Sequence, residues 1–210
     1  MIKPSVFALS VSVLCFLVFV GGAKAQAASP EDAVKNALNV GASIPVFDLK
    51  DSTGKSVSSK DLLKEGNLVV VFYRGSWCPF CNLYLRNLQK RLTDITNAGG
   101  KLVAISVENP DASMAIAKKN EVQFTVLSDP NLDVARKFGI VYQLPPATDE
   151  AYKSYGLDIA KHNNMAKPEL PLAVTYVVNK QGKIAYAFVD TDYKKRAEPD
   201  VIIENLRRIK

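Results

Sequence analysis

Two cysteines three residues apart are the residues of this chain best suited to chemistry. Cys78 and Cys81 stand in the stretch FYRGSWCPFC, and the remaining cysteine, Cys15, lies near the N-terminus. The thiolate is the nucleophilic form of cysteine, and a thiol pair at this spacing can form and break a disulfide. The stretch therefore predicts a redox-active dithiol.

Other uses of the pair are less well supported by the spacing. A structural disulfide would close a very short loop and gain little chain-entropy stabilisation. A structural zinc site needs four ligands, and apart from the N-terminal Cys15 the only other cysteine or histidine is His162. A zinc site within this chain is therefore not expected. His162 itself is expected at the surface, and the alternative of two inert core cysteines stays open.

The elements around the pair should place Cys78 at a helix N-terminus. Residues 68–72, LVVVF, predict a strand buried on both faces. From Phe80 the apolar residues follow a helical period up to Gly99. Cys78 then falls at the N-cap and Pro79 at the first helical position, where a missing N–H costs nothing. Free N–H groups and the helix dipole would stabilise a Cys78 thiolate.

Three neighbours, Arg74, Trp77 and Pro79, are candidates for a supporting role. Arg74 could add positive charge to the pair, although the sequence does not give its direction. Trp77 and Phe80 flank the cysteines and would shield them from water. Pro79 begins the helix that carries them.

The rest of the chain predicts an α/β fold. Strand and helix patterns alternate from residue 68 to residue 139, which favours a mainly parallel sheet. An insert follows, with a helix expected over about 149–161, and then a hairpin around Asn179–Gly182. Further helices are expected from Ser29 to about Gly41, over 110–120, after the cap Ser128–Pro130, and at the C-terminus.

A second polar constellation follows the last expected strand. The segment VDTDYKKRAEP, residues 189–199, contains Asp190, Asp192, Tyr193, Arg196 and Glu198. An exposed ion-pair loop is the commoner outcome for such a segment. The alternative is that this segment lines the cleft near the cysteines.

The N-terminus resembles a secretory signal. Lys3 is followed by an uncharged run and then by Ala23-Lys24-Ala25, an A-x-A pattern that favours cleavage after Ala25, with Ala27 as a second site. An uncut membrane anchor is the alternative, because the run approaches bilayer-spanning length. The predicted organisation is a signal segment at 1–25, a helical lead-in at 26–42 and one domain at 43–210. The expected location is exported, in the periplasm.

The charge pattern gives no support for nucleic-acid binding. The formal net charge is +6, and cleavage would remove two of the cations, Lys3 and Lys24. No block of like charges stands out, so the remaining excess reads as solvated surface.

Nearly all of the chain after the predicted signal segment resembles a known family. The stretches GASIPVFDLKDSTGKSV, NLVVVFYRGSWCPFCNLYLRNLQ, KLVAISVENPDAS, FTVLSDPNLDVARKFGIVYQLP, TYVVNKQGKI and DYKKRAEP resemble the alkyl hydroperoxide reductase/thiol-specific antioxidant family, in its peroxiredoxin-like branch with a Cys-x-x-Cys. The resemblance implies a thioredoxin-like fold, with a central mixed sheet flanked by helices. It also implies a thiol peroxidase that a thioredoxin-type protein re-reduces, one cysteine attacking the peroxide and the other forming a disulfide with it.

The motif departs from the typical family signature, Pro-x-x-x-Thr-x-x-Cys. Arg74 stands at the proline, Cys78 at the threonine and Cys81 at the peroxide-attacking cysteine. That alignment favours Cys81 as the attacker, whereas the helix N-terminus favours Cys78. Ala173 stands where typical members carry an arginine and where disulfide exchangers often carry a proline, the nearest proline being Pro171.

Three functional hypotheses follow from the sequence. The first is an exported thiol peroxidase, and the second is a thiol–disulfide oxidoreductase that acts on protein disulfides. The third is a binding module that keeps the fold without catalysis.

Overall fold

A computed structural model describes residues 28–209 of the chain. The predicted signal segment at 1–25 lies outside these residues. Among the described helices, none is long and apolar enough to cross a membrane. The strands are β1 (Asp48–Asp51), β2 (Ser56–Ser58), β3 (Asn67–Phe72), β4 (Gly100–Ser106), β5 (Thr125–Ser128), β6 (Val141–Gln143), β7 (Glu169–Pro171), β8 (Thr175–Val178) and β9 (Ile184–Phe188).

The main sheet is mixed, with seven strands in the order β2-β1-β5-β4-β3-β8-β9. The three central strands β3, β4 and β5 are parallel, as the continuous β-branched runs predicted. The strands β8 and β1 join them antiparallel, and β8 and β9 form the expected hairpin. All six residues of β3 are buried, so this strand is a rigid base for the cysteine motif that follows it.

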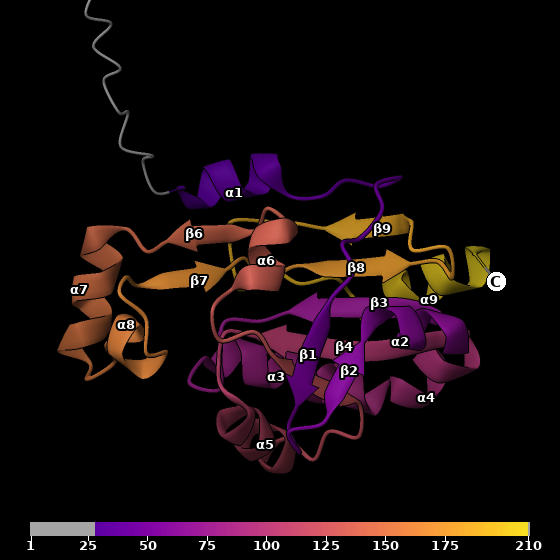
Figure 1. The fold of residues 1–210 in the computed structure, drawn as a ribbon, viewed down its shortest axis with the longest axis horizontal. Coiled ribbons are helices and arrows are strands. Elements are labelled where there is room, and N and C mark those ends of the chain that lie inside the picture. Colours follow the sequence, from indigo (N-terminus) through magenta and orange to yellow (C-terminus); the bar gives the residue numbers. More distant parts are fainter. Residues whose placement is uncertain (1–27, 210) are drawn as a thin grey trace, which may run out of the picture.

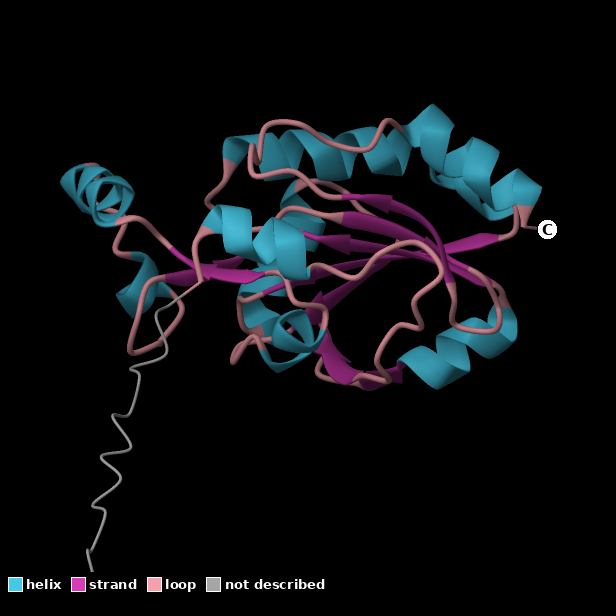
Figure 2. Ribbon diagram, turned by 90° about the horizontal axis from the view of Figure 1, so that it is seen from above, coloured by secondary structure: helices cyan, strands magenta, loops and turns pink. Residues whose placement is uncertain are grey.

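Helices cover both faces of the sheet (Figure 1, Figure 2). Their bounds are α1 (Pro30–Asn36), α2 (Ser59–Glu65), α3 (Pro79–Lys90), α4 (Leu92–Asn97), α5 (Pro110–Lys119), α6 (Asp133–Lys137), α7 (Pro146–Ser154), α8 (Ile159–His162) and α9 (Pro199–Arg208). One core cluster joins α3, α4, α5 and α9 to one face, through residues such as Leu85, Leu88, Ile95, Ile116 and Leu206. The other cluster joins α1, α2 and α6 to the opposite face, through residues such as Ala33, Leu62 and Phe138. The fold class predicted from the sequence is confirmed.

Several element boundaries differ from the prediction. The long helix expected after Phe80 is interrupted at Arg91, which ends α3 and precedes α4. The helix expected to start at the Ser128–Pro130 cap begins only at Asp133, although Asp129 does accept the N–H groups of Val134 and Ala135. The first helix ends at Asn36 rather than near Gly41. Apolar periodicity alone does not locate such breaks, because they depend on local backbone geometry.

The insert between β6 and β7 also differs from the prediction. The single helix expected over 149–161 is two helices, α7 and α8, separated by Gly156 at a φ of +81°. Strands β6 and β7 form a separate two-stranded sheet that the sequence did not indicate. This insert projects beyond one end of the main sheet, at the left of Figure 1 and Figure 2. Strands β3 and β4 point toward that same end (Figure 1).

Candidate active site

Cys78 caps the N-terminus of α3, as the sequence predicted. Pro79 occupies the first helical position, and Cys81 lies in the first turn. Both thiols are free, and both are buried, with 1% and 0% of their surface exposed. The pair therefore sits below the protein surface, where a small molecule has easier access than another folded protein.

The loop before Cys78 is fixed by a network of hydrogen bonds. The Asn82 side-chain amide donates to the carbonyl groups of Ser76 and Cys78, at 2.8 and 3.0 Å. Asn82 in turn accepts from the side chain of Asn120, at 2.8 Å. The Ser76 N–H and hydroxyl donate to the buried carboxylate of Glu108, at 2.6 and 2.7 Å. These contacts order the turn that brings the first thiol to the end of β3.

Gly75 allows this turn to be tight. Its φ of +151° is unusual for a residue with a side chain, and a Cβ there would lie 2.4 Å from Nε1 of Trp77. Trp77 therefore packs directly over the Gly75 backbone, beside the cysteine motif. No local sequence pattern indicates this contact, because it depends on the turn conformation.

Arg74 is buried behind the cysteines, with 2% of its surface exposed. Its guanidinium donates to the Tyr152 hydroxyl at 2.6 Å and lies 3.9 Å from the ring centroid of Tyr193 and 4.9 Å from that of Trp77. Within residues 28–209, no carboxylate forms a salt bridge with it. A buried cation without an acidic partner is costly. The nearby thiol of Cys78 is a group that could supply the opposite charge.

Two side chains of the segment at residues 189–199, those of Tyr193 and Arg196, contact the residues of the cysteine site. Arg196 donates to Sγ of Cys81 at 3.4 Å, and Tyr193 stacks on Arg74. The commoner interpretation, an exposed ion-pair loop, is right only for Lys195 and Asp190, which pair at 3.1 Å. The cleft alternative is right for the arginine and the tyrosine, because the chain after β9 folds back over α3.

These surroundings separate the acidities of the two thiols. The pKa of Cys78 is lowered to about 6 by its interaction with the Cys81 thiol, against the effect of burial, with help from the charges of Arg74 and Arg196. The pKa of Cys81 is raised well above its ordinary value by the Cys78 sulfur and by burial, which outweigh the Arg196 charge. These opposite shifts favour the thiolate on Cys78 over the thiolate on Cys81 near neutral pH.

His162 is exposed, as predicted, but it also has a specific partner. Its Nε2 lies 3.0 Å from Oε1 of Glu108, the carboxylate that holds Ser76. This pair could not be predicted from the sequence, because 54 residues separate His162 from Glu108. Across residues 28–209, no group of three or more potential ligands is arranged to hold a metal ion.

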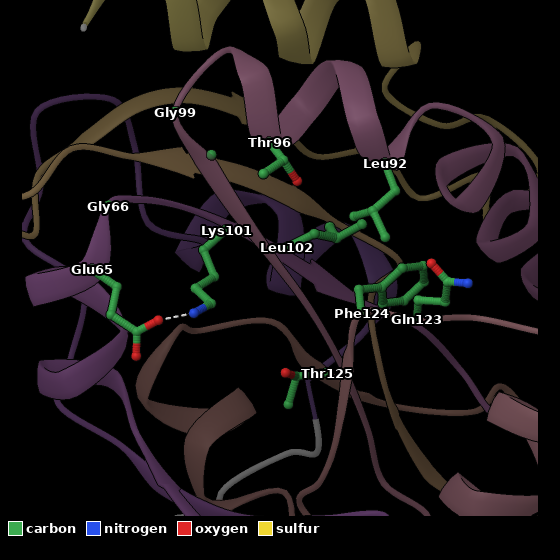
Figure 3. A pocket seen from close by; sticks show the side chains of 11 residues that line it. Glu65, Gly66, Leu92, Thr96, Gly99, Lys101, Leu102, Gln123, Phe124 and Thr125 are labelled. Atoms are coloured by element: carbon green, nitrogen blue, oxygen red, sulfur yellow. Dashed lines mark ion pairs between the residues drawn. The ribbon is translucent and has the colours of Figure 1, made fainter.

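Two surface pockets differ in their position relative to the cysteine site. One, of about 450 Å³, adjoins Arg196 and is lined by Phe80, Tyr84 and Phe188 among others. The other, of about 330 Å³, contains the Glu65–Lys101 ion pair and lies at the starts of β3 and β4 (Figure 3). The cysteines follow the opposite end of β3, so the pocket of Figure 3 is not part of their site.

Comparison with known proteins agrees with this geometry. Residues 40–187 match the model of the AhpC/TSA family. The chain belongs to the AhpC/TSA family. It is a peroxiredoxin-like oxidoreductase with a thioredoxin-like fold, as the motif resemblance implied.

Curated relatives of this AhpC/TSA chain include peroxiredoxins. It is 25% identical to the peroxiredoxin Bcp of Escherichia coli (strain K12) over 173 residues, which cover 82% of this chain and 97% of that one. It is 30% identical to the chloroplastic peroxiredoxin Q of Populus jackii over 145 residues, covering 65% and 68% of the two chains.

Solved structures support the fold of this AhpC/TSA chain. The peroxidoxin BcpB of Mycobacterium tuberculosis aligns with a TM-score of 0.67 at 20% identity, over 82% of this chain and 99% of that one. A bacterioferritin comigratory protein of Xanthomonas campestris, described for its alkyl peroxide reduction, aligns with a TM-score of 0.60 at 16% identity, over 77% and 90%. At these identities the likeness concerns the fold alone.

Proposed function

We propose that the protein is a thiol peroxidase in which Cys78 and Cys81 cycle between dithiol and disulfide. The observation that carries this proposal is a buried thiol pair flanked by two guanidinium groups, Arg74 and Arg196, neither of which forms a salt bridge with a carboxylate within residues 28–209. Family membership supports peroxide as the substrate. A thioredoxin-type protein is the proposed reductant, and no cofactor enters the cycle.

The proposed cycle assigns the first attack to Cys78. Its thiolate attacks one peroxide oxygen, the O–O bond breaks, and the released alkoxide or hydroxide takes up a proton. Cys78 becomes a sulfenic acid, which is reversible. Cys81 then attacks that sulfur and expels water, forming the disulfide. Two thiols of the reductant restore the pair by exchange and become a disulfide themselves.

The electrostatics of the site support this order. The lowered pKa of Cys78 makes it the thiolate near neutral pH, and the helix N-terminus adds favourable dipoles. The family alignment instead favours Cys81, and the contact from Arg196 to its sulfur speaks for that order. Single substitutions distinguish the two. In Cys81→Ser a sulfenic acid should accumulate on Cys78 after one equivalent of peroxide, whereas Cys78→Ser should react slowly.

Trp77 offers a direct test of the peroxidase proposal. It is the only tryptophan and adjoins Cys78, so its fluorescence should report oxidation of the pair. We expect the reduced protein, mixed with stoichiometric hydrogen peroxide in a stopped flow, to change fluorescence orders of magnitude faster than free cysteine oxidises. A rate like that of free cysteine would exclude the peroxidase.

The second candidate is thiol–disulfide exchange with protein substrates. It is favoured by the Cys-x-x-Cys at a helix N-terminus and disfavoured by the burial of both sulfurs, since exchange needs access to the attacking thiol. An insulin reduction assay distinguishes the candidates. Fast insulin turnover together with slow peroxide chemistry would support exchange.

The proposal includes export to the periplasm. It rests on the A-x-A pattern that ends at Ala25, in a part of the chain outside the described residues. We expect the protein recovered from a periplasmic extract to begin at Gln26 or Ala28 by intact mass. Full-length protein in the membrane fraction would instead support the uncut anchor.

A further inference from the structure

The insert between β6 and β7 touches the cysteine loop through two side chains. Tyr152 of α7 accepts a hydrogen bond from Arg74, and its ring lies 5.8 Å from that of Trp77. His162 of α8 meets Glu108, which holds Ser76. The Tyr152 contact ends on the loop that carries Cys78, whereas the His162 contact reaches that loop through Glu108, which follows β4.

The Arg74 guanidinium is held almost entirely by aromatic groups. Three rings, those of Tyr193, Trp77 and Tyr152, lie 3.9, 4.9 and 5.5 Å from its central carbon. Among the described residues its Nε has no hydrogen-bond partner, and its shortest side-chain hydrogen bond is the 2.6 Å bond to the Tyr152 hydroxyl, with Tyr142 as a second tyrosine on the same side. Flat stacking fixes the plane of a guanidinium but leaves it free to slide, whereas a hydrogen bond fixes its position within that plane.

We propose that Tyr152 is a positioning residue that fixes the Arg74 guanidinium beside the cysteine pair, so that the insert completes the active site. The inference rests on the proposed function for its biological meaning, since it concerns the thiols that would attack peroxide. Without the Tyr152 hydroxyl, the guanidinium keeps its charge but loses the contact that orients it toward the pair.

The charged and titratable groups around Cys78 define what Arg74 contributes. Cys81 comes from the same helix, Arg74 from the preceding loop, and Arg196 from the segment after β9. Tyr142 of β6 and Tyr152 of α7 face Arg74 from the insert side. Displacing Arg74 leaves Arg196 and the helix N-terminus in place, so we expect a weaker Cys78 thiolate rather than its complete loss.

The test compares Tyr152→Phe with Tyr155→Phe. Tyr152→Phe removes only the hydroxyl that Arg74 contacts. Tyr155→Phe removes the hydroxyl of a residue that directly follows the same helix and is 87% exposed. The ultraviolet absorbance of the thiolate is titrated as the difference between reduced and disulfide protein, which cancels the tyrosines. We expect Tyr152→Phe to raise the Cys78 midpoint by about one unit, roughly tenfold less thiolate below it, with Tyr155→Phe unchanged.

A double-mutant cycle shows whether Tyr152 acts through Arg74. In an Arg74→Lys background the cation remains but the guanidinium fork is gone, so Tyr152→Phe should add almost nothing. An equal shift in both backgrounds would overturn the inference, as would an unchanged midpoint in Tyr152→Phe alone. Circular dichroism confirms that each variant is folded, and Tyr152→Trp, which keeps a stacking ring without the hydroxyl, replaces Tyr152→Phe if that variant does not fold.

This readout is independent of peroxidase activity. If the midpoint shifts as expected while peroxide chemistry is slow, the positioning role stands and the proposed function fails. If peroxide chemistry is fast and the midpoint does not move, the proposed function stands and the positioning role fails.

Discussion

At the level of single residues, the site separates two chemically identical thiols by their surroundings. The charges of Arg74 and Arg196 and a helix N-terminus favour a thiolate on Cys78, whereas burial and the Cys78 sulfur disfavour one on Cys81 despite its contact with Arg196. Two negative charges on interacting sulfurs repel each other, so a lowered pKa of one thiol is accompanied by a raised pKa of the other. An attacking group and a resolving group can thus arise from a single motif.

The first prediction concerns the pH dependence of this pair. Thiolate is present above its pKa, so alkylation of Cys78 by iodoacetamide should be fast at neutral pH and fall as the pH drops through about 6. The raised pKa of Cys81 should keep that residue unmodified at neutral pH. Peptide mass spectrometry of the reduced protein assigns each site, and preferential alkylation of Cys81 would contradict the assignment.

At the level of elements, the loop between β3 and α3 converts a buried strand into an active-site turn. Its conformation depends on hydrogen bonds from α3 to the loop carbonyl groups and on the absence of a side chain at residue 75. Single substitutions at Asn82 and Gly75 remove these two features, and matched control positions are available elsewhere in the chain.

Asn82→Ala should loosen this turn. It leaves the carbonyl groups of Ser76 and Cys78 without their side-chain donor, and we expect a loss of roughly 1–3 kcal/mol in the free energy of unfolding. Asn87→Ala, at an exposed position of the same helix, is the control and should change stability little. Urea unfolding measures both, and equal losses would show that the Asn82 network is not what stabilises the turn.

Gly75→Ala should distort the turn more directly. The new methyl group would meet the indole of Trp77 at a φ that disfavours side chains, and we expect a cost of about 1–3 kcal/mol. Gly54→Ala is the matched control, because its φ of +83° imposes backbone strain with no atom within 4 Å. The clash predicts a change in Trp77 fluorescence in the first variant only, and identical spectra would contradict it.

At the level of the whole molecule, both faces of the sheet are closed by helices from distant parts of the sequence. The C-terminal helix α9 packs on the same cluster as α3, and Leu206 lies fully buried against the start of β4. The segment that leads into α9 is the one that brings Arg196 to Cys81. Docking of α9 therefore supports both the core and the site.

Leu206→Ala tests this coupling. The cavity should lower the free energy of unfolding by about 2–5 kcal/mol, whereas Val201→Ala, at a position 36% exposed on the same helix, should have a small effect. We expect Trp77 fluorescence and far-ultraviolet circular dichroism to report one coincident transition. Two separate transitions would mean that the cysteine face and the rest of the fold unfold independently.

Four features could be predicted from the sequence, namely the fold class, the central strands, the β8–β9 hairpin and the place of Cys78 at a helix N-terminus. These features follow from local signals, namely β-branched runs, helical periodicity and the Cys-Pro step, each of which depends on neighbouring residues. The division into a lead-in and a domain, and the export signal, remain predictions.

The identity of the side chains that surround the thiols depends on the tertiary structure. Arg74 could be named from the motif, but its contact with Tyr152 spans 78 residues, and the contact of Arg196 with Cys81 spans 115. The split of the insert into α7 and α8, which places Tyr152 and His162, was also missed. Such contacts depend on how the crossovers and the insert pack onto one end of the sheet, and no local pattern in the chain specifies that packing.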